Sequence, residues 1–431
     1  MRIDRLRVQN FRCFDDREWT FAPGFNVLIG DNGAGKSALL DALAISLDPV
    51  VYKAKGMPAR VIRPDDTRLS RMEPQFPVII KAGGGYEEQQ IEWERTLSGN
   101  PNAKTTIAGT KVIRHLAQTL FAHKRSSEPL IAPVISYYTS GRLWRQKREK
   151  LEHTASPGSK LRGYDFALDA KANNDFLFRW FKTTQLAAMQ SVFEKGSHYD
   201  PLLQAIRFAI AECMEGDRKY MSFDIAQNAV VVADEGGHDR LPFRMLSDGQ
   251  RNIAALVLDL GYRCATLNPH LGESALAQTP GVVLIDEIDL HLHPKWQRRI
   301  AGDLRAMFPR VQFIASTHSP IILQNLSPAT DCVIDLSKTS PHRIGDFADQ
   351  PVEDVLIEQG YEEPHLSARR QAMIEAAEEY YLVLKRARKA EPAELDRLKR
   401  RMDELALPYA DNAAYIAFLN MERRAELGGK A

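Results

Sequence analysis

The sequence is poor in cysteine, and its few cysteines show no pattern. Among 431 residues there are four cysteines, and no two of them have the C-x-x-C spacing of a zinc or redox site. This distribution argues against a disulfide framework and against a cysteine-based zinc site. It is typical of thiols that stay reduced in the cytoplasm.

Long apolar runs and an excess of charge of either sign are also missing. No apolar run reaches the ~18 residues that a membrane-spanning helix needs, and the N-terminal segment is too polar for a signal peptide. The formal net charge is +1, so any binding of nucleic acid would depend on a local patch. We therefore expect a cytoplasmic protein that does not associate with a membrane.

Short apolar runs that end in turn residues alternate with helical patterns along most of the chain. Three runs, at residues 25–29, 282–285 and 311–315, have the apolar character of strands buried on both faces. This alternation predicts an α/β fold. Further strands are expected at residues 3–8, 133–138, 220–225, 229–233 and 332–336, with 220–233 forming a hairpin.

Two local signals predict where elements end. The segment 36–47 has leucines at helical spacing, and Asp48-Pro49 should stop this helix. The three glycines at 83–85 should form the turn between a strand at 77–81 and a strand at 90–95.

Residues 30–37 fit the phosphate-binding pattern G-x-x-x-x-G-K-[ST], and they follow an apolar strand and precede an amphipathic helix, as this pattern requires. Glycines allow the loop to wrap phosphates with inward-pointing N–H groups, and the helix start favours an anion. Lys36 is expected to reach the β- and γ-phosphates of ATP, and the Ser37 hydroxyl to ligate Mg²⁺. The nucleotide-binding candidates are Gly30, Asp31, Asn32, Gly33, Ala34, Gly35, Lys36, Ser37 and Ala38.

A second motif, Gly-Val-Val-Leu-Ile-Asp-Glu at residues 281–287, places two carboxylates after a buried strand. Ligands bind at this end of the strands in parallel α/β sheets. Asp286 is expected to hold Mg²⁺, directly or through water, and Glu287 to act as the general base for an attacking water. Apolar runs that end in acids are common, so this motif gains its meaning from the phosphate-binding loop.

A third motif, Leu-Ser-Asp-Gly-Gln at residues 246–250, predicts a helix start with Ser247 as its N-cap. Alone it would indicate an ordinary capped helix. Its place before the acidic strand favours a second set of N–H groups that meet an anion. We therefore expect Ser247, Gly249 and Gln250 to contact nucleotide.

Histidines supply the last candidates. His318 follows the strand at 311–315, where its imidazole can hydrogen-bond a γ-phosphate, so it is a second catalytic candidate. The alternative is that this histidine, like most single histidines, has only a structural role. His291 and His293 invite a metal interpretation, but two ligands are too few for a site.

The motifs lie within residues 1–336, and their order along the chain resembles that of ABC ATPases. The resemblance is to the branch of SMC, RecF and overcoming-lysogenisation-defect proteins. Residues 246–250 resemble the signature motif, with Asp248 in place of its commoner glycine, His318 resembles the switch histidine, and 288–294 resemble the D-loop. The resemblance implies a two-lobed head that closes head-to-tail with a second copy of the chain around two ATP molecules.

The N-terminal segment Asn10-Phe11-Arg12-Cys13-Phe14 resembles the N-F-R segment of the same branch. That resemblance implies a nucleotide contact for Arg12. The glutamine of the Q-loop is not identified, and the candidates are Gln75, Gln146 and the stretch 135–142.

The resemblance is greatest to the PtuA-like ATPases of Septu and retron anti-phage defence systems. The chain lacks the long heptad segment of SMC proteins, and after Pro320 it lacks the D-x-D cluster of a nuclease. The resemblance implies a slow ATPase that controls a separate HNH nuclease, with a reverse transcriptase, retron nucleic acid or DNA as further partners. The alternatives are a RecF-like repair ATPase that binds DNA directly and a nucleotide-bound scaffold with little turnover.

The span of the motifs and the helical patterns set the expected domain bounds. An ATPase head is expected at 1–340, with a mostly helical insertion at about 141–215, and a helical region at 341–431 either caps the head or docks a partner. In this region Asp411 could cap a final helix, and an apolar stripe follows an earlier one. The stripe consists of Leu395, Leu398, Met402 and Leu405.

The basic run 142–150, which includes Trp144, either binds a phosphate backbone or is a solvated face.

Overall fold

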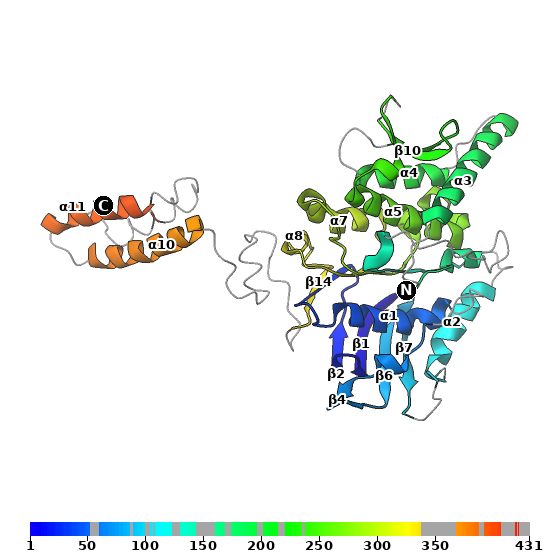
Figure 1. The fold of residues 1–431 in the computed structure, drawn as a ribbon, viewed down its shortest axis with the longest axis horizontal. Coiled ribbons are helices and arrows are strands. Elements are labelled where there is room, and N and C mark those ends of the chain that lie inside the picture. Colours follow the sequence, from blue (N-terminus) through cyan, green and yellow to red (C-terminus); the bar gives the residue numbers. More distant parts are fainter. Residues whose placement is uncertain are drawn as a thin grey trace. The chain divides into compact units, whose positions relative to one another are not determined.

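A computed structural model describes residues 1–51, 60–86, 89–99, 104–106, 108–122, 130–143, 160–168, 174–195, 201–213, 220–234, 238–337, 368–387, 392–406, 419 and 421. The chain forms two compact units, Met1–Gln350 and Pro351–Ala431. The first unit is an α/β structure and contains all four sequence motifs (Figure 1). None of the described helices combines the length and the apolar character needed to cross a bilayer.

The centre of the first unit is a five-stranded sheet in the order β14-β3-β13-β12-β8. Every adjacent pair of strands is parallel. The strands are almost wholly buried, as expected of a parallel sheet with both faces covered. The apolar runs predicted these strands with ends that differ by at most one residue. Their bounds are β3 (Phe25–Ile29), β8 (Val134–Tyr138), β12 (Gly281–Ile285), β13 (Val311–Ser316) and β14 (Cys332–Asp335).

A second, antiparallel sheet has the order β2-β1-β6-β7. The predicted turn at the glycines 83–85 is wrong, because these residues lie inside β6. A Cβ at Gly84 would lie 2.1 Å from the carbonyl oxygen of Arg2, so glycine is needed where β1 approaches β6. The bounds are β1 (Arg2–Phe11), β2 (Phe14–Thr20), β6 (Val78–Tyr86) and β7 (Gln89–Leu97), with the short strands β4 (Leu69–Ser70) and β5 (Glu73–Pro74) forming a separate pair.

Helix α1 (Lys36–Val51) contacts strands of both sheets and lies between them (Figure 1). The predicted helix end at Asp48-Pro49 is wrong, since the helix continues through Pro49. Proline has no N–H to donate to the carbonyl four residues earlier, which belongs to Ile45. Arg95 Nη1 donates to that carbonyl at 3.1 Å and to Asp48 Oδ2 at 3.1 Å, so the buried helix end keeps its hydrogen bonds.

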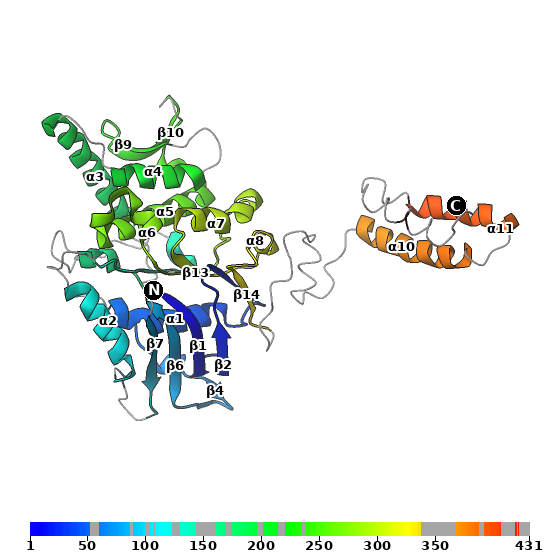
Figure 2. The same ribbon diagram turned by 180° about the vertical axis from the view of Figure 1, so that it is seen from behind.

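On the opposite side of the parallel sheet lie α5 and α7, and α4 packs on them farther from the sheet in both views (Figures 1 and 2). The predicted hairpin at 220–233 is confirmed, because β9 and β10 pair antiparallel and β11 adds a third strand. The remaining bounds are α2 (Lys111–Ala122), α3 (Asn174–Lys195), α4 (Pro201–Cys213), β9 (Tyr220–Asp224), β10 (Ala229–Ala233), β11 (Arg240–Pro242), α5 (Asp248–Leu267), α6 (Ala275–Gln278), α7 (Pro294–Met307) and α8 (Pro320–Leu323).

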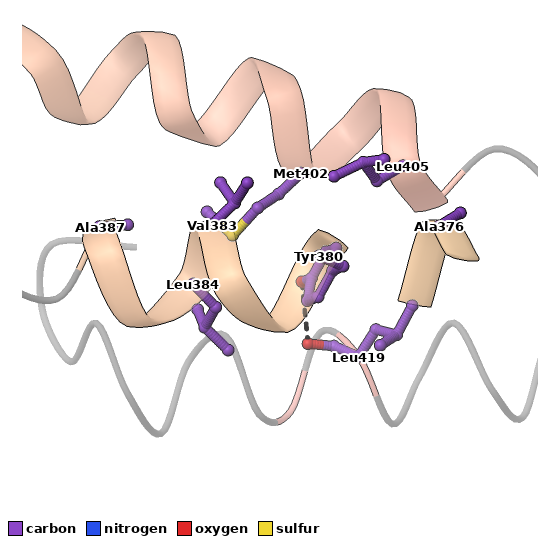
Figure 3. Close-up of a cluster of buried hydrophobic side chains, with 8 residues drawn as sticks. All are labelled: Ala376, Tyr380, Val383, Leu384, Ala387, Met402, Leu405 and Leu419. Carbon is purple, nitrogen blue, oxygen red and sulfur yellow. Dashed lines mark hydrogen bonds between the residues drawn. The ribbon is translucent and has the colours of Figure 1, made fainter. Parts of the chain in front are cut away.

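The second unit contains α10 (Ala368–Ala387) and α11 (Pro392–Ala406), which pack against each other. Of the predicted apolar stripe, Met402 and Leu405 are buried in this core and Leu398 packs against it. The Tyr380 hydroxyl donates to the Leu419 carbonyl at 3.2 Å (Figure 3). The predicted cap at Asp411 lies outside the described residues. Besides Leu398, the core consists of Ala376, Tyr380, Val383, Leu384, Ala387, Met402, Leu405 and Leu419, with Tyr381 at its edge.

Candidate functional site

The strand order of the parallel sheet gathers the motifs at one edge. Because all five strands are parallel, their carboxyl ends meet at the same side of the sheet. The loop 30–35 follows β3, and Asp286 and Glu287 follow β12. Strand β13 lies between these two strands and ends at Ser316, so His318 comes from the middle of the same edge.

The phosphate-binding loop has the backbone that its glycines permit. Gly30, Gly33 and Gly35 all have positive φ angles. At Gly35, a Cβ would also lie 2.5 Å from Phe14 Cζ and 2.6 Å from Cys13 Sγ, so the β1–β2 turn packs directly against the loop. Asp31 and Asn32 are exposed, Ala34 is half-buried and Ala38 is buried in the first turn of α1.

Lys36 folds back over this loop. Its Nζ donates to the carbonyl oxygens of Gly30 at 2.6 Å and Asp31 at 3.0 Å. Burial lowers the pKa of Lys36 below its ordinary value, although the nearby carboxylates of Asp286 and Asp31 oppose this shift. The ammonium group is therefore held inside the cradle where phosphate oxygens would lie.

Ser37 and Asp286 meet although 249 residues separate them in sequence: the Ser37 hydroxyl donates to Asp286 Oδ2 at 2.9 Å. Ser316, at the end of β13, donates to the other carboxylate oxygen, Oδ1, at 2.6 Å. Two hydroxyls thus fix the orientation of one carboxylate at the sheet edge. Hydroxyl and carboxylate oxygens are the ligands that Mg²⁺ prefers.

Glu287 has an unusual backbone, with φ of +50°. A non-glycine residue in this region stores about 1–3 kcal/mol of strain, and such strain is concentrated at functional sites. Ser316 stabilises the conformation, because its Oγ accepts from the Glu287 N–H at 2.8 Å and its carbonyl accepts from Ile288 N at 2.9 Å. The half-buried Glu287 side chain therefore leaves the strand at a fixed angle.

His318 is exposed, and its buried neighbours hold the turn that carries it. Thr317 N donates to the Leu28 carbonyl at 3.2 Å, and Thr317 Oγ1 donates to Asp289 Oδ1 at 2.6 Å. Ser319 caps α8 by accepting from Ile321 N. The turn thus joins the P-loop strand to the segment after Glu287.

Arg12 is bound by two carboxylates of its own chain. Its Nη1 donates to Asp41 Oδ2 at 2.6 Å, and its Nε donates to Asp66 Oδ1 at 2.9 Å. Burial opposes the charged form, but Asp41 and Asp66 outweigh it and raise the pKa of Arg12. Asp41 lies one helical turn after Ser37, so Arg12 clamps the start of α1, and its contact with nucleotide stays a prediction.

Helix α5 begins as its sequence predicts. Ser247 is the N-cap: its Oγ accepts from Gln250 N at 3.3 Å, and its own N–H donates to Gln250 Oε1 at 3.2 Å. Ser247 and Asp248 are exposed, Gly249 is buried, and Arg251 forms an ion pair with Asp248. The exposed helix start can meet a ligand from outside this chain.

The two histidines of the segment 288–294 are both exposed. His293 Nδ1 accepts from Lys295 N at 3.3 Å and caps α7. Within the described part of the chain, no group of three or more His, Cys, Asp or Glu side chains could hold a metal ion. His293 is thus a helix cap, as Ser247 is for α5.

Two contributors to this edge were missed by the sequence analysis. Ser316 was not singled out, and Tyr138 was included only in the expected strand at 133–138 and in a possible Q-loop stretch. The Asp286 N–H donates to the Tyr138 carbonyl at 2.7 Å, because β8 lies beside β12. Gln75 lies apart from this edge and donates to the Glu73 carbonyl. Gln146 and most of the basic run 142–150 lie outside the described residues.

Comparisons with known proteins give matches over most of the chain. Residues 5–189 match a family described as an AAA domain, and residues 123–324 match one described as an AAA domain, putative AbiEii toxin, Type IV TA system. The Retron Ec83 probable ATPase of Escherichia coli is 27% identical over 402 residues, covering 76% of this chain and 70% of that protein. The Septu protein PtuA of Bacillus thuringiensis is 32% identical over 334 residues, covering 75% and 73%. A crystallised SMC head bound to the C-winged helix domain of ScpA is 16% identical, with a TM-score of 0.48, covering 78% of this chain and 94% of that one.

Proposed function

This chain belongs to the PtuA-like family of ATPases, and from that premise we propose that it binds and hydrolyses ATP between two copies of itself. Each nucleotide lies between residues 30–38 of one copy and the start of α5 in the other. The observation that carries the proposal is the contact of Ser37 with Asp286, which joins the phosphate-binding loop to the acidic strand at one edge of the sheet.

The fit to Mg²⁺ is supported by the chemistry of the two residues. Mg²⁺ is commonly bound by one or two carboxylates together with substrate phosphates and water, and Ser37 and Asp286 offer such oxygens within hydrogen-bond distance of each other. Ser37 and Asp286 would hold the ion, which would neutralise charge on the phosphates. Ser316 keeps the Asp286 carboxylate turned toward Ser37.

Glu287 and His318 act on the γ-phosphate. Glu287 accepts a proton from the water that attacks the γ-phosphorus, the bond to the bridging oxygen breaks, and ADP and phosphate result. His318 donates a hydrogen bond to a γ-phosphate oxygen. Lys36 holds the β- and γ-phosphates, and the N–H groups of the loop bind their remaining oxygens.

The second copy closes the site from the other side. Ser247, Gly249 and Gln250 lie at the positive end of the α5 dipole, which favours an anion. The exposed start of this helix at Ser247 receives the γ-phosphate bound by the first copy. ATP binding therefore joins two heads, and hydrolysis separates them, so that the nucleotide acts as a switch between two states.

This arrangement predicts opposite results for two substitutions of similar shape. Ser247→Asp should abolish ATP-dependent dimerisation, because its carboxylate repels the γ-phosphate of the other copy. Ser247→Asn should retain dimerisation, because asparagine and aspartate are both good N-caps and α5 stays intact in either variant. Size-exclusion chromatography with ATP and Mg²⁺ measures the dimer, and equilibrium binding of ATP at low protein concentration should give similar affinities for both variants.

Mixing two inactive variants tests whether the site is shared. A Ser247→Asp copy has an intact phosphate-binding loop, and a Lys36→Ala copy has an intact α5 start. Their mixed dimer holds one complete site, so the mixture should recover ATP turnover that neither variant shows alone. If the two variants form mixed dimers and the mixture still shows no ATP turnover, the shared site is contradicted.

The biological setting follows from the relatives, which are named as a retron ATPase and a Septu protein. In this proposal residues 1–340 form the ATPase head of a defence system, and the helical residues 341–431 dock a separate HNH nuclease. A chain without Pro351–Ala431 should keep ATP turnover and lose the nuclease on co-purification with the products of neighbouring genes. Retention of the nuclease by the shortened chain would rule out docking on this unit.

A further inference from the structure

The last residue of β8 touches two functional elements at once. Through its main chain, Tyr138 accepts a hydrogen bond of 2.7 Å from the Asp286 N–H. Through its side chain, Tyr138 donates from its hydroxyl to Asp259 Oδ2 at 2.5 Å, in the buried interior. Asp259 belongs to α5, the helix that starts at the Ser247 cap. One residue therefore joins the carboxylate that faces Ser37 to the helix whose start faces the other copy.

The contact on α5 is itself firmly held. Arg263 Nε donates to Asp259 Oδ2 at 2.7 Å, and both side chains are buried. Arg263 Nη1 also donates to the carbonyls of Gly163 at 2.9 Å and Asp165 at 3.1 Å. A charged pair in this setting has well-defined geometry, because each unmade hydrogen bond would leave a buried polar group unsatisfied.

Helix α5 also contacts the segment that follows Asp286. Asn252, in its second turn, donates to the Leu290 carbonyl at 3.1 Å. The helix therefore contacts two neighbours of Asp286. One is Tyr138, at the end of the adjacent strand β8, and the other is Leu290, four residues after Asp286. Asp259 lies ~17 Å along the helix axis from Asp248, at 1.5 Å per residue. An α-helix of this length moves as one body, so a displacement of its first turn also moves Asp259.

We propose that Tyr138 is a positioning residue that couples the two nucleotide sites of the dimer, an inference that rests on the proposed ATP-bound pair of copies. When the start of α5 binds the nucleotide held by the other copy, Asp259 and Tyr138 move together with the Asp286 main chain. Occupation of one site thereby adjusts the metal-facing carboxylate of the other site.

The state of the tyrosine suits this role. Burial, and next the charge of Asp259, raise the pKa of Tyr138 well above its ordinary value. The hydroxyl therefore keeps its proton and remains a donor throughout the range in which the protein works. The connection is a permanent part of the fold and needs no ionisation step.

Tyr138→Phe removes only the hydroxyl and leaves Asp259 paired with Arg263. At protein concentrations that keep the two copies paired, ATP turnover measured against ATP concentration should change from cooperative to nearly independent sites, with the Hill coefficient falling from close to 2 to close to 1. Site coupling typically changes the affinity of one site by 5- to 150-fold, so we expect the ATP concentration that gives half-maximal turnover to rise by roughly tenfold. At low protein concentration, ATP is bound only by the phosphate-binding loop of a single copy. The ATP affinity measured there should stay within about threefold of that of the unaltered protein, since no loop residue contacts the hydroxyl.

A second tyrosine provides a matched control. Tyr164 is fully buried, and its hydroxyl donates to the Pro133 carbonyl at 2.5 Å, beside the opposite end of β8. Tyr164→Phe removes an equivalent buried hydroxyl but leaves the contact with α5 and Asp286 unchanged. Both variants should lose thermal stability to a similar degree, and only Tyr138→Phe should lose cooperativity.

The outcomes distinguish this inference from the function on which it rests. Cooperative turnover in Tyr138→Phe, or an equal loss of cooperativity in Tyr164→Phe, would overturn the role of Tyr138 while leaving the shared site intact. If the unaltered protein does not dimerise with ATP, the proposed function itself is wrong, and the coupling falls with it.

Discussion

Glu287→Gln is expected to lower ATP turnover by about 10²- to 10⁴-fold, the contribution of a general base. Glutamine has the shape of glutamate but cannot accept the proton of the attacking water. The contact from Ser316 is made to the main-chain N–H of residue 287, so the turn remains in place. ATP should still bind, and because hydrolysis no longer separates the copies, the dimer should accumulate. Phosphate release measures turnover, and size-exclusion chromatography measures the dimer.

Glu273→Gln is the matched control for this result. Glu273 is exposed and lies in the 3₁₀ turn Pro269–Ser274, outside the sheet edge that carries the motifs. Its turnover should equal that of the unaltered protein. Normal turnover in Glu287→Gln would show that another group accepts the proton, and the assignment of the base would have to be abandoned.

Asp286→Asn is expected to remove the dependence of ATP binding on Mg²⁺. Loss of an outer-shell partner of a metal already costs about 10- to 100-fold in metal affinity, and the loss of a ligand should cost at least as much. The amide still occupies the space between Ser37 and Ser316, so the fold should be retained. Binding of ATP with Mg²⁺ should weaken accordingly, whereas binding in the presence of a chelator should match that of the unaltered protein.

A buried aspartate on the same sheet edge separates the loss of a metal ligand from the loss of a buried charge. Asp335 ends β14 and accepts from Ser337 N at 2.9 Å. Asp335→Asn should keep the response to Mg²⁺. Two results would argue against Asp286 as the residue that holds the ion. One is an equal effect of the two substitutions on ATP binding, and the other is weaker ATP binding by Asp286→Asn even in the presence of a chelator.

The parallel sheet was predictable because its strands depend on local composition. Each of its five apolar runs became a strand, since a strand buried on both faces requires such a run whatever its neighbours are. The two errors lie where tertiary contacts override local preference. Gly84 allows the close approach of another strand, and Pro49 remains in a helix because a distant arginine replaces its hydrogen bond.

The candidate site was predictable in its parts and not in its connections. The glycine-rich loop, the two acids and the serine cap each have a local sequence pattern. Ser316 and Tyr138 have none, because their roles arise from the order of the strands. Ser316 reaches Asp286 since β13 lies next to β12, and Tyr138 reaches it from β8 on the other side. Sheet order is a property of the whole fold, and no single segment encodes it.

The buried Arg95 has a consequence for the order in which this protein assembles. The last turn of α1 depends on a guanidinium from β7, and Asp48 would be a buried charge without it. We therefore expect the carboxyl end of the helix that begins at the phosphate-binding loop to become stable only when the antiparallel sheet has docked. The nucleotide cradle and that sheet should form as a single cooperative folding unit, although they are built from different segments of the chain.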